Sequence, residues 1–219
     1  MKTGDQNMRT VGHPTAADPT HTKLLEAAGE VFARSGYYAA TIREICTRAG
    51  ANVASVNYHF GDKLKLYTEV LRQSFAQSEV IRKVFDQDAA PEEILRQVIR
   101  GMVQGICGDP SDFHLRLRAH ELAQPTPAIA RIIDESVRPI YDRLRETIAK
   151  ILGLPRDHQK TRLCTHSVIG QVVHYAHAGP FLARLWPELE MTPEQLEQIA
   201  NHIAEFSLAY LRKARSNPG

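Results

Sequence analysis

Cysteine is scarce in this sequence of 219 residues, which contains only Cys46, Cys107 and Cys164. An odd number of widely separated cysteines, each within an apolar helical pattern, predicts reduced core residues of a cytoplasmic protein. No apolar run approaches the length of a membrane span, and the first residues lack the apolar core of a signal peptide. We therefore expect a cytoplasmic protein that has no membrane partner.

Excess charge of one sign is lacking as well. The 27 Lys and Arg residues nearly balance the 25 Asp and Glu residues, which leaves a formal net charge of +2. Any contact with nucleic acid must therefore come from a local basic patch and not from the whole surface. The alternation of apolar and polar residues that is typical of strands does not extend over a useful length, whereas apolar residues recur at helical spacing. The sequence predicts an all-α fold.

Signatures of catalysis are also missing. The chain contains no nucleophile elbow, no phosphate-binding glycine loop and no H-E-x-x-H motif, and no pair of carboxylates stands out. A histidine-rich segment near residues 166–177 is the only feature that favours an enzyme. We therefore expect neither catalytic residues nor a bound cofactor.

The stretch from Thr41 to Lys63 carries the strongest local pattern. Thr41 and Glu44 form a capping box at a helix start, and Gly50 suits the left-handed turn residue that ends a helix. A second short helix can begin at Asn52. Two short helices joined by a glycine-containing turn predict a helix-turn-helix, whose second helix enters the DNA major groove. The pattern alone leaves open a small helical hairpin with a solvated polar face.

Three longer motifs surround this stretch: L-x-A-A-x-x-x-F-A-x-x-G-Y, T-x-x-x-I-x-x-x-A-G and V-N-Y-H-F-x-x-K-x-x-L. Together they cover about the first third of the chain and resemble the N-terminal DNA-binding region of TetR-family transcription regulators. Leu64 departs from the Glu that the family often carries at this position. Residues 111–213, with the segments LRAHELAQPTPAIARIIDESVRPIYDRL and GQVVHYAHAGPFLARLWPEL, look like the C-terminal domain of the CecR-like branch.

Residues 1–18 are polar and are interrupted by glycine and proline, which predicts a flexible arm. The resemblance implies a three-helix helix-turn-helix domain at 19–66 and a larger helical effector-binding and dimerisation domain at 67–215. It also implies the DNA contacts by position. The residues that match phosphate-contacting positions are Thr41, Tyr58, His59 and Lys63. The residues that match positions facing base edges are Arg43, Val53, Ala54, Ser55 and Asn57.

Two of these side chains suit specific base contacts. Asn57 suits paired hydrogen bonds to adenine and Arg43 suits paired bonds to guanine, each worth about 1–3 kcal/mol of discrimination. Many relatives carry Tyr where Asn57 stands, so their operator preferences do not transfer to this chain. For Tyr58, packing against the first helix is the alternative to a phosphate contact.

The rest of the chain alternates between apolar helical stripes and strong helix breakers. Long helices are predicted at residues 18–36, 63–85, 111–123, 128–152, 158–178 and 192–215, and a further helix begins at Pro91. Pro139 lies inside one of these segments and should kink or split that helix.

A pocket between bundle helices is usually apolar with a few placed polar groups, and the C-terminal region offers such a mixture. The candidate effector-binding residues are Arg116, His120, Glu121, Tyr141, Gln171, His174, Tyr175, Phe181 and Trp186. For each of them, an ordinary core or surface position is the alternative.

Three histidines, His166, His174 and His177, fall on one stripe of a helical wheel. Three imidazoles suit Zn²⁺, but no carboxylate or thiolate lies at close ligand spacing, since Cys164 points elsewhere on the wheel. We therefore expect no metal site, and we expect these residues to line a polar pocket or the dimer seam.

The combined interpretation is a homodimeric, ligand-responsive transcription regulator, and we expect it to act as a repressor. A small-molecule effector would release it from a near-palindromic stretch of double-stranded operator DNA. Pairing of the last two helices with a second subunit is predicted through Val168, Val172, Ile199, Ile203, Phe206 and Tyr210. Two alternatives stay open: an effector-independent activator, and a metal- or small-molecule-binding sensor that acts through protein contacts.

Overall fold

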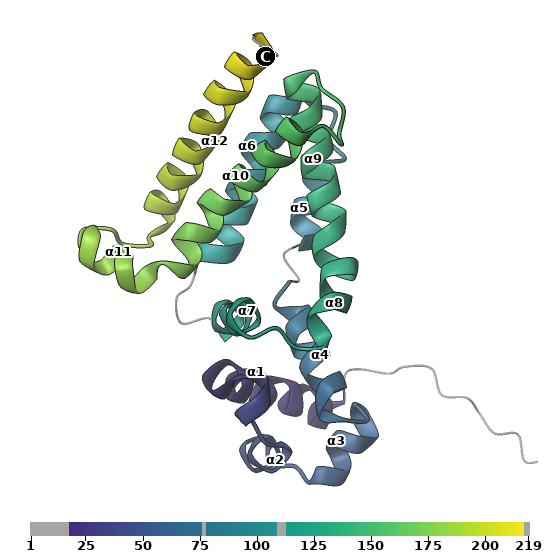
Figure 1. Ribbon diagram of the computed structural model, residues 1–219. Coiled ribbons are helices and arrows are strands. Elements are labelled where there is room, and N and C mark those ends of the chain that lie inside the picture. The colour runs from purple at the N-terminus through teal and green to yellow at the C-terminus, as the bar shows by residue number, and fades with distance from the viewer. Residues whose placement is uncertain (1–17, 76–77, 109–112, 217–219) are drawn as a thin grey trace, which may run out of the picture.

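The computed structural model describes residues 18–75, 78–108 and 113–216, and every regular element within these ranges is a helix (Figure 1). The elements are α1 (Pro19–Ala39), α2 (Ile42–Ala49), α3 (Val53–His59), α4 (Lys63–Gln73), α5 (Ser78–Val84), α6 (Pro91–Cys107), α7 (Phe113–Ala123), α8 (Ala128–Ile132), the π-helical turn η1 (Ile133–Val137), α9 (Arg138–Leu152), α10 (Gln159–His177), α11 (Gly179–Leu185) and α12 (Pro193–Ser216). This confirms the predicted all-α fold. The predicted arm lies outside the described residues except for Asp18. None of the described helices is both long and apolar enough to cross a membrane.

The helix-turn-helix forms through the local signals that predicted it. The Thr41 hydroxyl accepts a hydrogen bond from the backbone N–H of Glu44 at 3.2 Å, which caps α2. Gly50 ends α2 in the left-handed conformation, with φ 63° and ψ 33°, where a Cβ would be strained. The Asn52 side chain then caps α3 by accepting from the N–H of Ser55 at 2.8 Å. The Glu44 carboxylate does not complete the capping box, because it pairs with Arg34 of α1.

One hydrophobic core holds α1 to α4 together and continues into later helices. Phe32 and Leu66 are fully buried within it, as are Leu117 of α7 and Ile132 of α8. In Figure 1, α7 lies directly above α1, between the helix-turn-helix and the upper helices. The predicted domain boundary after residue 66 falls inside α4, whose buried residues on both sides of it belong to this core. We call α1–α4, α7 and α8 the N-terminal lobe.

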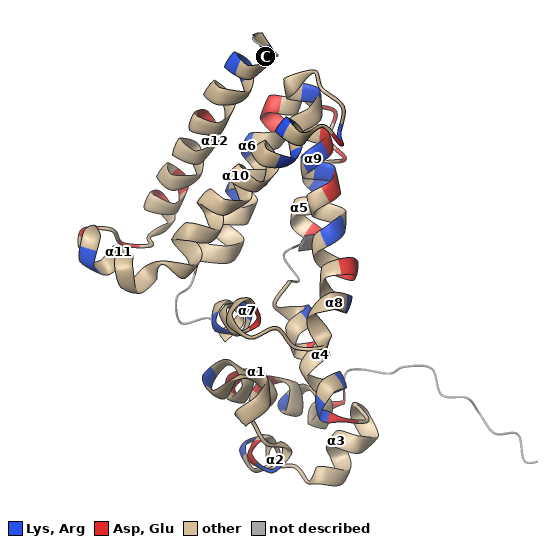
Figure 2. Ribbon diagram, in the orientation of Figure 1, with Lys and Arg blue, Asp and Glu red and all other residues tan. Residues whose placement is uncertain are grey.

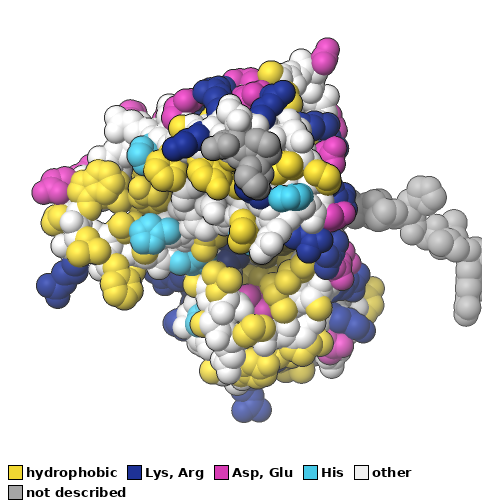
Figure 3. All heavy atoms as spheres, turned by 45° about the horizontal axis from the view of Figure 1, so that its top comes forward, with side chains coloured by type: hydrophobic (Ala, Val, Ile, Leu, Met, Phe, Trp, Pro, Cys, Tyr) yellow, Lys and Arg dark blue, Asp and Glu magenta, His cyan; other side chains and the backbone are white. Residues whose placement is uncertain are grey.

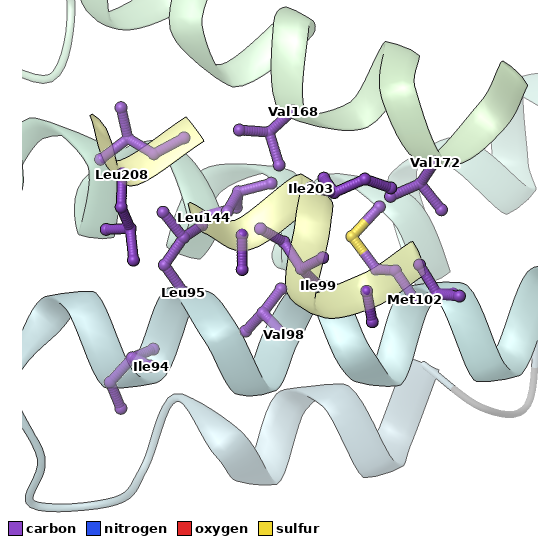
Figure 4. Close-up of a cluster of buried hydrophobic side chains, with 14 of the residues drawn as sticks. Ile94, Leu95, Val98, Ile99, Met102, Leu144, Val168, Val172, Ile203 and Leu208 are labelled. Carbon is purple, nitrogen blue, oxygen red and sulfur yellow. The ribbon is translucent and has the colours of Figure 1, made fainter. Parts of the chain in front are cut away.

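A second core joins α5, α6, α9, α10 and α12, which we call the C-terminal lobe. Figure 4 shows side chains of α6 pointing toward those of α10 and α12. Four of the predicted dimer contacts lie inside this core: Val168, Val172, Ile199 and Ile203 are at most 5% exposed. The prediction is therefore wrong for these four residues, because their stripes face helices of the same chain and offer no surface to a second subunit.

The helix predicted over residues 63–85 is two helices. At the end of α4, the N–H of Ser74 bonds to the Leu71 carbonyl at 3.1 Å and the Ser74 hydroxyl donates to the same carbonyl at 2.6 Å. The Arg118 guanidinium of α7 donates to the Ser74 carbonyl, which a continuing helix would use for its own next turn. A guanidinium that is remote in sequence thus donates the hydrogen bond that the Ser74 carbonyl at the end of α4 would otherwise lack.

The helix predicted over residues 128–152 is split near Pro139, as expected. The chain forms α8, then the wide π-helical turn η1, and then α9 with Pro139 in its first turn. Pro139 has no N–H to donate to the Glu135 carbonyl four residues earlier. The Arg82 guanidinium of α5 donates to that carbonyl instead, at 2.8 Å. Helix α5 therefore supports the break in the α8–α9 segment.

This compensation can be measured with a double-mutant cycle. Arg82→Met removes the donor to the Glu135 carbonyl, so we expect a loss of about 1 kcal/mol in the free energy of unfolding. In a Pro139→Ala background, residue 139 supplies its own N–H and the loss should shrink. Arg82→Met also removes the Arg82–Glu79 ion pair, but it does so in both backgrounds, so the contribution of this pair cancels in the difference between the two losses. Urea unfolding of the four proteins gives the coupling; equal losses in the two backgrounds would refute the compensation.

Candidate DNA interface and effector region

Helix α3 presents a neutral polar face outward while its other face anchors it. Val56 is fully buried in the N-terminal core, and Phe60 follows it there. Val53, Ala54 and Asn57 are exposed on the opposite side. Figure 2 shows no charged residue on α3, in contrast to α2 and the start of α4. A short, uncharged, anchored helix flanked by cations matches what a recognition helix in the major groove requires.

Tyr58 is 85% exposed, so it does not pack against α1 and its hydroxyl is free to reach a phosphate. The Ser55 hydroxyl is less available for a contact with DNA. Its hydroxyl donates to the Asn52 side chain at 3.0 Å, so toward a base edge it has only acceptor capacity left.

His59 takes a different position from the predicted one. Its side chain is only 11% exposed, and its Nε2 lies 3.6 Å from Oδ2 of Asp18, the residue that caps α1. The ring also makes an edge contact with His21, whose ring stacks on Phe60 at 4.6 Å. The predicted phosphate contact is corrected accordingly: His59 joins the end of α3 to the start of α1, because its ring is drawn into an aromatic cluster.

Lys63 and Arg43 differ in how freely their charges can reach DNA. The Lys63 ammonium lies 4.6 Å from the centre of the Tyr37 ring, and partial burial lowers the pKa of Lys63. The Arg43 side chain, at the start of α2, forms no ion pair with any residue that the structure describes. Arg43 is thus the freer of the two cations.

Thr41 and Arg43 border a shallow hollow of about 560 Å³ between α1 and α2. The other residues lining it are Arg34, Glu44, Thr47 and Arg48. Arg34 pairs with Glu44, and Arg48 pairs with Glu30, so two of the three guanidiniums are neutralised locally. The sequence analysis did not single out Arg34, Thr47 or Arg48. In the sequence, only their spacing indicated a role for Thr47 and Arg48, because they lie one helical turn beyond Arg43 and Glu44.

The predicted effector residues do not form one site. Arg116 and His120 border a shallow hollow of about 430 Å³ between α7 and α1, and His120 Nε2 lies 3.1 Å from the Ala33 carbonyl. Glu121 is buried between α4, α7 and α8. These three residues therefore face the N-terminal lobe, which corrects the prediction of a shared pocket, because α7 packs on α1 and α4.

The remaining effector candidates lie on the C-terminal lobe. The Tyr141 hydroxyl is 3.4 Å from His166 Nε2, which joins α9 to α10. Gln171 donates to the Ser207 hydroxyl of α12 at 3.2 Å. His174 is exposed, whereas Tyr175 is half-buried against the C-terminal core. Phe181 and Trp186 are exposed on and beside α11 and face no enclosed site with the others.

The three histidines of α10 do not converge. No group of three His, Cys, Asp or Glu side chains that could hold a metal ion occurs within residues 18–75, 78–108 and 113–216. His166 and His174 share a stripe, but eight residues of helix separate them by about 12 Å along the axis. His177 is partly buried, and burial and the Arg118 charge lower its pKa.

Exposed large apolar side chains concentrate on α10 to α12. They are Leu163, Phe181, Leu185, Trp186, Phe206 and Tyr210, half of all such side chains in the described part of the chain. Figure 3 shows hydrophobic side chains gathered with histidines on this side of the molecule. We call these six residues the α10–α12 apolar face. Phe206 and Tyr210 are the two predicted subunit contacts that lie on this face, whereas Leu163 and Leu185 were not among the predicted contacts. An exposed concentration of this kind marks an interaction surface.

These features define a helix-turn-helix DNA-binding protein with a second, helical lobe. Residues 24–70 match the family described as bacterial regulatory proteins, tetR family, and residues 91–211 match the C-terminal domain of the HTH-type transcriptional dual regulator CecR. The chain belongs to the TetR family of transcriptional regulators and carries a CecR-type C-terminal domain.

Individual relatives agree with this assignment. The chain is 27% identical to the HTH-type transcriptional dual regulator CecR of Shigella flexneri, over 70% of this chain and 74% of the relative. It is 33% identical to the HTH-type transcriptional repressor NicS of Pseudomonas putida, over 43% of this chain and 45% of the relative. Its fold is similar to that of the fatty acid degradation regulator FadR from Bacillus halodurans, with a TM-score of 0.66, 17% identity and coverage of 90% and 99% of the two chains. These proteins are transcriptional regulators and not enzymes. This chain, likewise, is a transcriptional regulator and not an enzyme.

Proposed function

We propose that this protein is a homodimeric repressor that a small molecule releases from a near-palindromic operator. The observation that carries the proposal is the outer face of α3, which is exposed, neutral and polar, and is anchored by the N-terminal core. Two such helices in a symmetric dimer read two half-sites about one helical turn apart, or a multiple of it. The names of relatives, among them the repressor NicS, support repression.

The α10–α12 apolar face is the proposed dimer interface. Phe206 and Tyr210 are 63% and 55% exposed on the outer side of α12 and are free to pack against a second subunit. Large aromatic side chains at the centre of an interface contribute most of its binding energy. The face lies on α10 to α12, above the helix-turn-helix in Figure 1, so each subunit keeps its recognition helix available.

The proposed effector binds in the C-terminal lobe. Tyr141, Gln171, His174 and Tyr175 remain candidates because they lie on α9 and α10, away from the DNA-binding surface. A regulator with the same fold, FadR from Bacillus subtilis, has been crystallised in complex with stearoyl-CoA; it has a TM-score of 0.65 and 17% identity. An effector that prefers the conformation with misplaced recognition helices shifts the population away from the operator.

The test is a salt titration of binding to an operator selected by the wild-type protein from a random DNA pool. A steep fall of affinity with salt is expected, since phosphate contacts release counterions. Lys65 is a cation for this role, because its side chain is 71% exposed beside α3, with the ammonium 3.6 Å from the Asp62 carboxylate. Lys65→Ala should reduce the slope of log affinity against log salt by about two in a dimer, one unit for each half-site.

The matched control is Lys150→Ala, because Lys150 also lies near a carboxylate, 3.8 Å from Glu146, but on the far end of α9. It should leave the slope unchanged. Failure of the wild-type protein to select any DNA at low salt would contradict the proposed function and favour a sensor that acts through protein contacts.

A further inference from the structure

Glu121 is the only charged side chain that is buried in the described part of the chain, with 5% exposure. Its carboxylate accepts three hydrogen bonds. The Tyr67 hydroxyl donates to Oε1 at 2.6 Å, the Thr126 hydroxyl donates to Oε1 at 2.7 Å, and the Thr126 backbone N–H donates to Oε2 at 3.0 Å. Burying a carboxylate is costly unless such donors surround it, so this arrangement needs a reason beyond filling space.

The three partners of the network come from different elements. Tyr67 lies in the second turn of α4, Glu121 near the end of α7, and Thr126 in the segment that leads into α8. The Thr126 hydroxyl also accepts from the N–H of Ala128, the first residue of α8, at 3.3 Å. A single carboxylate on α7 therefore connects α4 to the segment that leads into α8.

Tyr67 is held firmly on its other side. It is fully buried, and its ring packs edge-on against Phe32 of α1 at 4.8 Å and in a tilted arrangement against Tyr37 at 4.9 Å. Burial and the hydrogen bond to Glu121 raise the pKa of Tyr67, so its hydroxyl stays protonated as a donor. Tyr67 is thus fixed between the Glu121 carboxylate and the aromatic rings of α1, and is not a loose side chain.

The first turns of α4 are close to the recognition helix. Helix α3 ends at His59 and α4 begins at Lys63, with Gly61 at φ 85° between them. We propose that Glu121 is a positioning residue, which sets the tilt of α4 against α7 and thereby the separation of the two recognition helices in the dimer. Hydrogen bonds are directional, so they specify one tilt where apolar packing alone tolerates sliding. This inference rests on the proposed dimeric operator binding.

Two small substitutions test it without removing side-chain volume. Tyr67→Phe deletes one donor and keeps the ring contacts. Glu121→Gln keeps one acceptor oxygen but presents an amide N–H₂ group to a donor of Thr126. The matched control is Glu146→Gln, which changes a carboxylate to an amide at an exposed position of α9, where Glu146 lies 3.8 Å from the Lys150 ammonium. Circular dichroism and cooperative urea unfolding establish that each variant is folded.

The measurement is affinity for a series of operators whose half-sites are moved apart or together by one and two base pairs. The wild-type protein is expected to prefer the selected spacing by about tenfold or more, and both variants should reduce this preference to about threefold or less, as expected when a coupling between two sites is lost. Glu146→Gln should keep the wild-type preference. A purely structural role would lower the affinity of the variants for every spacing by the same factor.

The outcomes separate the two proposals. If the wild-type protein selects no operator, the proposed function fails. If the wild-type protein binds with a clear spacing preference and both folded variants keep that preference, Glu121 does not position α4 and this inference is overturned.

Discussion

Asn57→Ala is expected to weaken operator binding at least about thirtyfold. Asn57 is exposed at the centre of the outer face of α3, where its amide can donate to and accept from an adenine edge at once. One such paired contact contributes about 1–3 kcal/mol, and a dimer loses two of them, which gives about 2–6 kcal/mol. Fluorescence anisotropy with the selected operator, at one fixed salt concentration, measures the change.

The pattern of the loss distinguishes base reading from general damage. Asn57 is uncharged, so the salt slope should stay at the wild-type value while the preference for one A·T pair in each half-site disappears. Asn201→Ala is the matched control, since Asn201 is exposed on α12 and its side chain donates to Glu197 of its own helix at 3.2 Å. Equal weakening on all DNA sequences would show that Asn57 supports the helix and does not read a base.

Local features of this fold could be predicted from the sequence because their causes are local. Thr41, Gly50 and Asn52 act on backbone groups within three or four residues, so their roles follow from residue type and spacing. Pro139 breaks its helix for the same reason, since the missing N–H belongs to the residue itself. The family motifs then placed these helices in a DNA-binding domain, which the comparisons confirm.

Other features depend on partners that are remote in sequence. An apolar stripe shows that a helix face is buried but not what buries it. The periodicity of the sequence is therefore equally consistent with Val168 and Val172 as subunit contacts and as core residues, and the structure places them in the core. Helix α4 ends where Arg118, more than 40 positions later, takes the Ser74 carbonyl. No periodicity within α4 carries that information.

In the candidate site, too, some features follow from local sequence and others depend on partners that are remote in sequence. Exposure of Asn57 and Tyr58 follows from the helical wheel of α3 alone. His59 lies on the same short helix, but it turns toward Asp18 because an aromatic cluster and a carboxylate from α1 are within reach. Glu121 was predicted as a pocket residue because it lies with Arg116 and His120 among the polar residues of one helix. Only the fold shows that Tyr67 and Thr126 use both of its oxygens.

Phe206→Arg is expected to dissociate the dimer and to abolish tight operator binding at the same time. Phe206 is 63% exposed in the subunit, so the substitution leaves the C-terminal core intact. In a symmetric interface each substitution occurs twice, and an aromatic anchor contributes about 2–4 kcal/mol at each occurrence. The dimer dissociation constant should therefore rise by about three orders of magnitude or more. Sedimentation over a concentration series measures it.

The control must separate loss of the dimer from loss of solubility or fold. Val80→Arg places the same cation on α5, at an apolar residue that is 66% exposed and far from the α10–α12 apolar face, and it should leave the protein dimeric. A monomeric Phe206→Arg protein reads one half-site at a time, so its operator affinity should recover only at concentrations where dimers form. If Phe206→Arg remains dimeric and still binds the operator tightly, the subunits pair through another surface, and the distance between the two α3 helices must be set there.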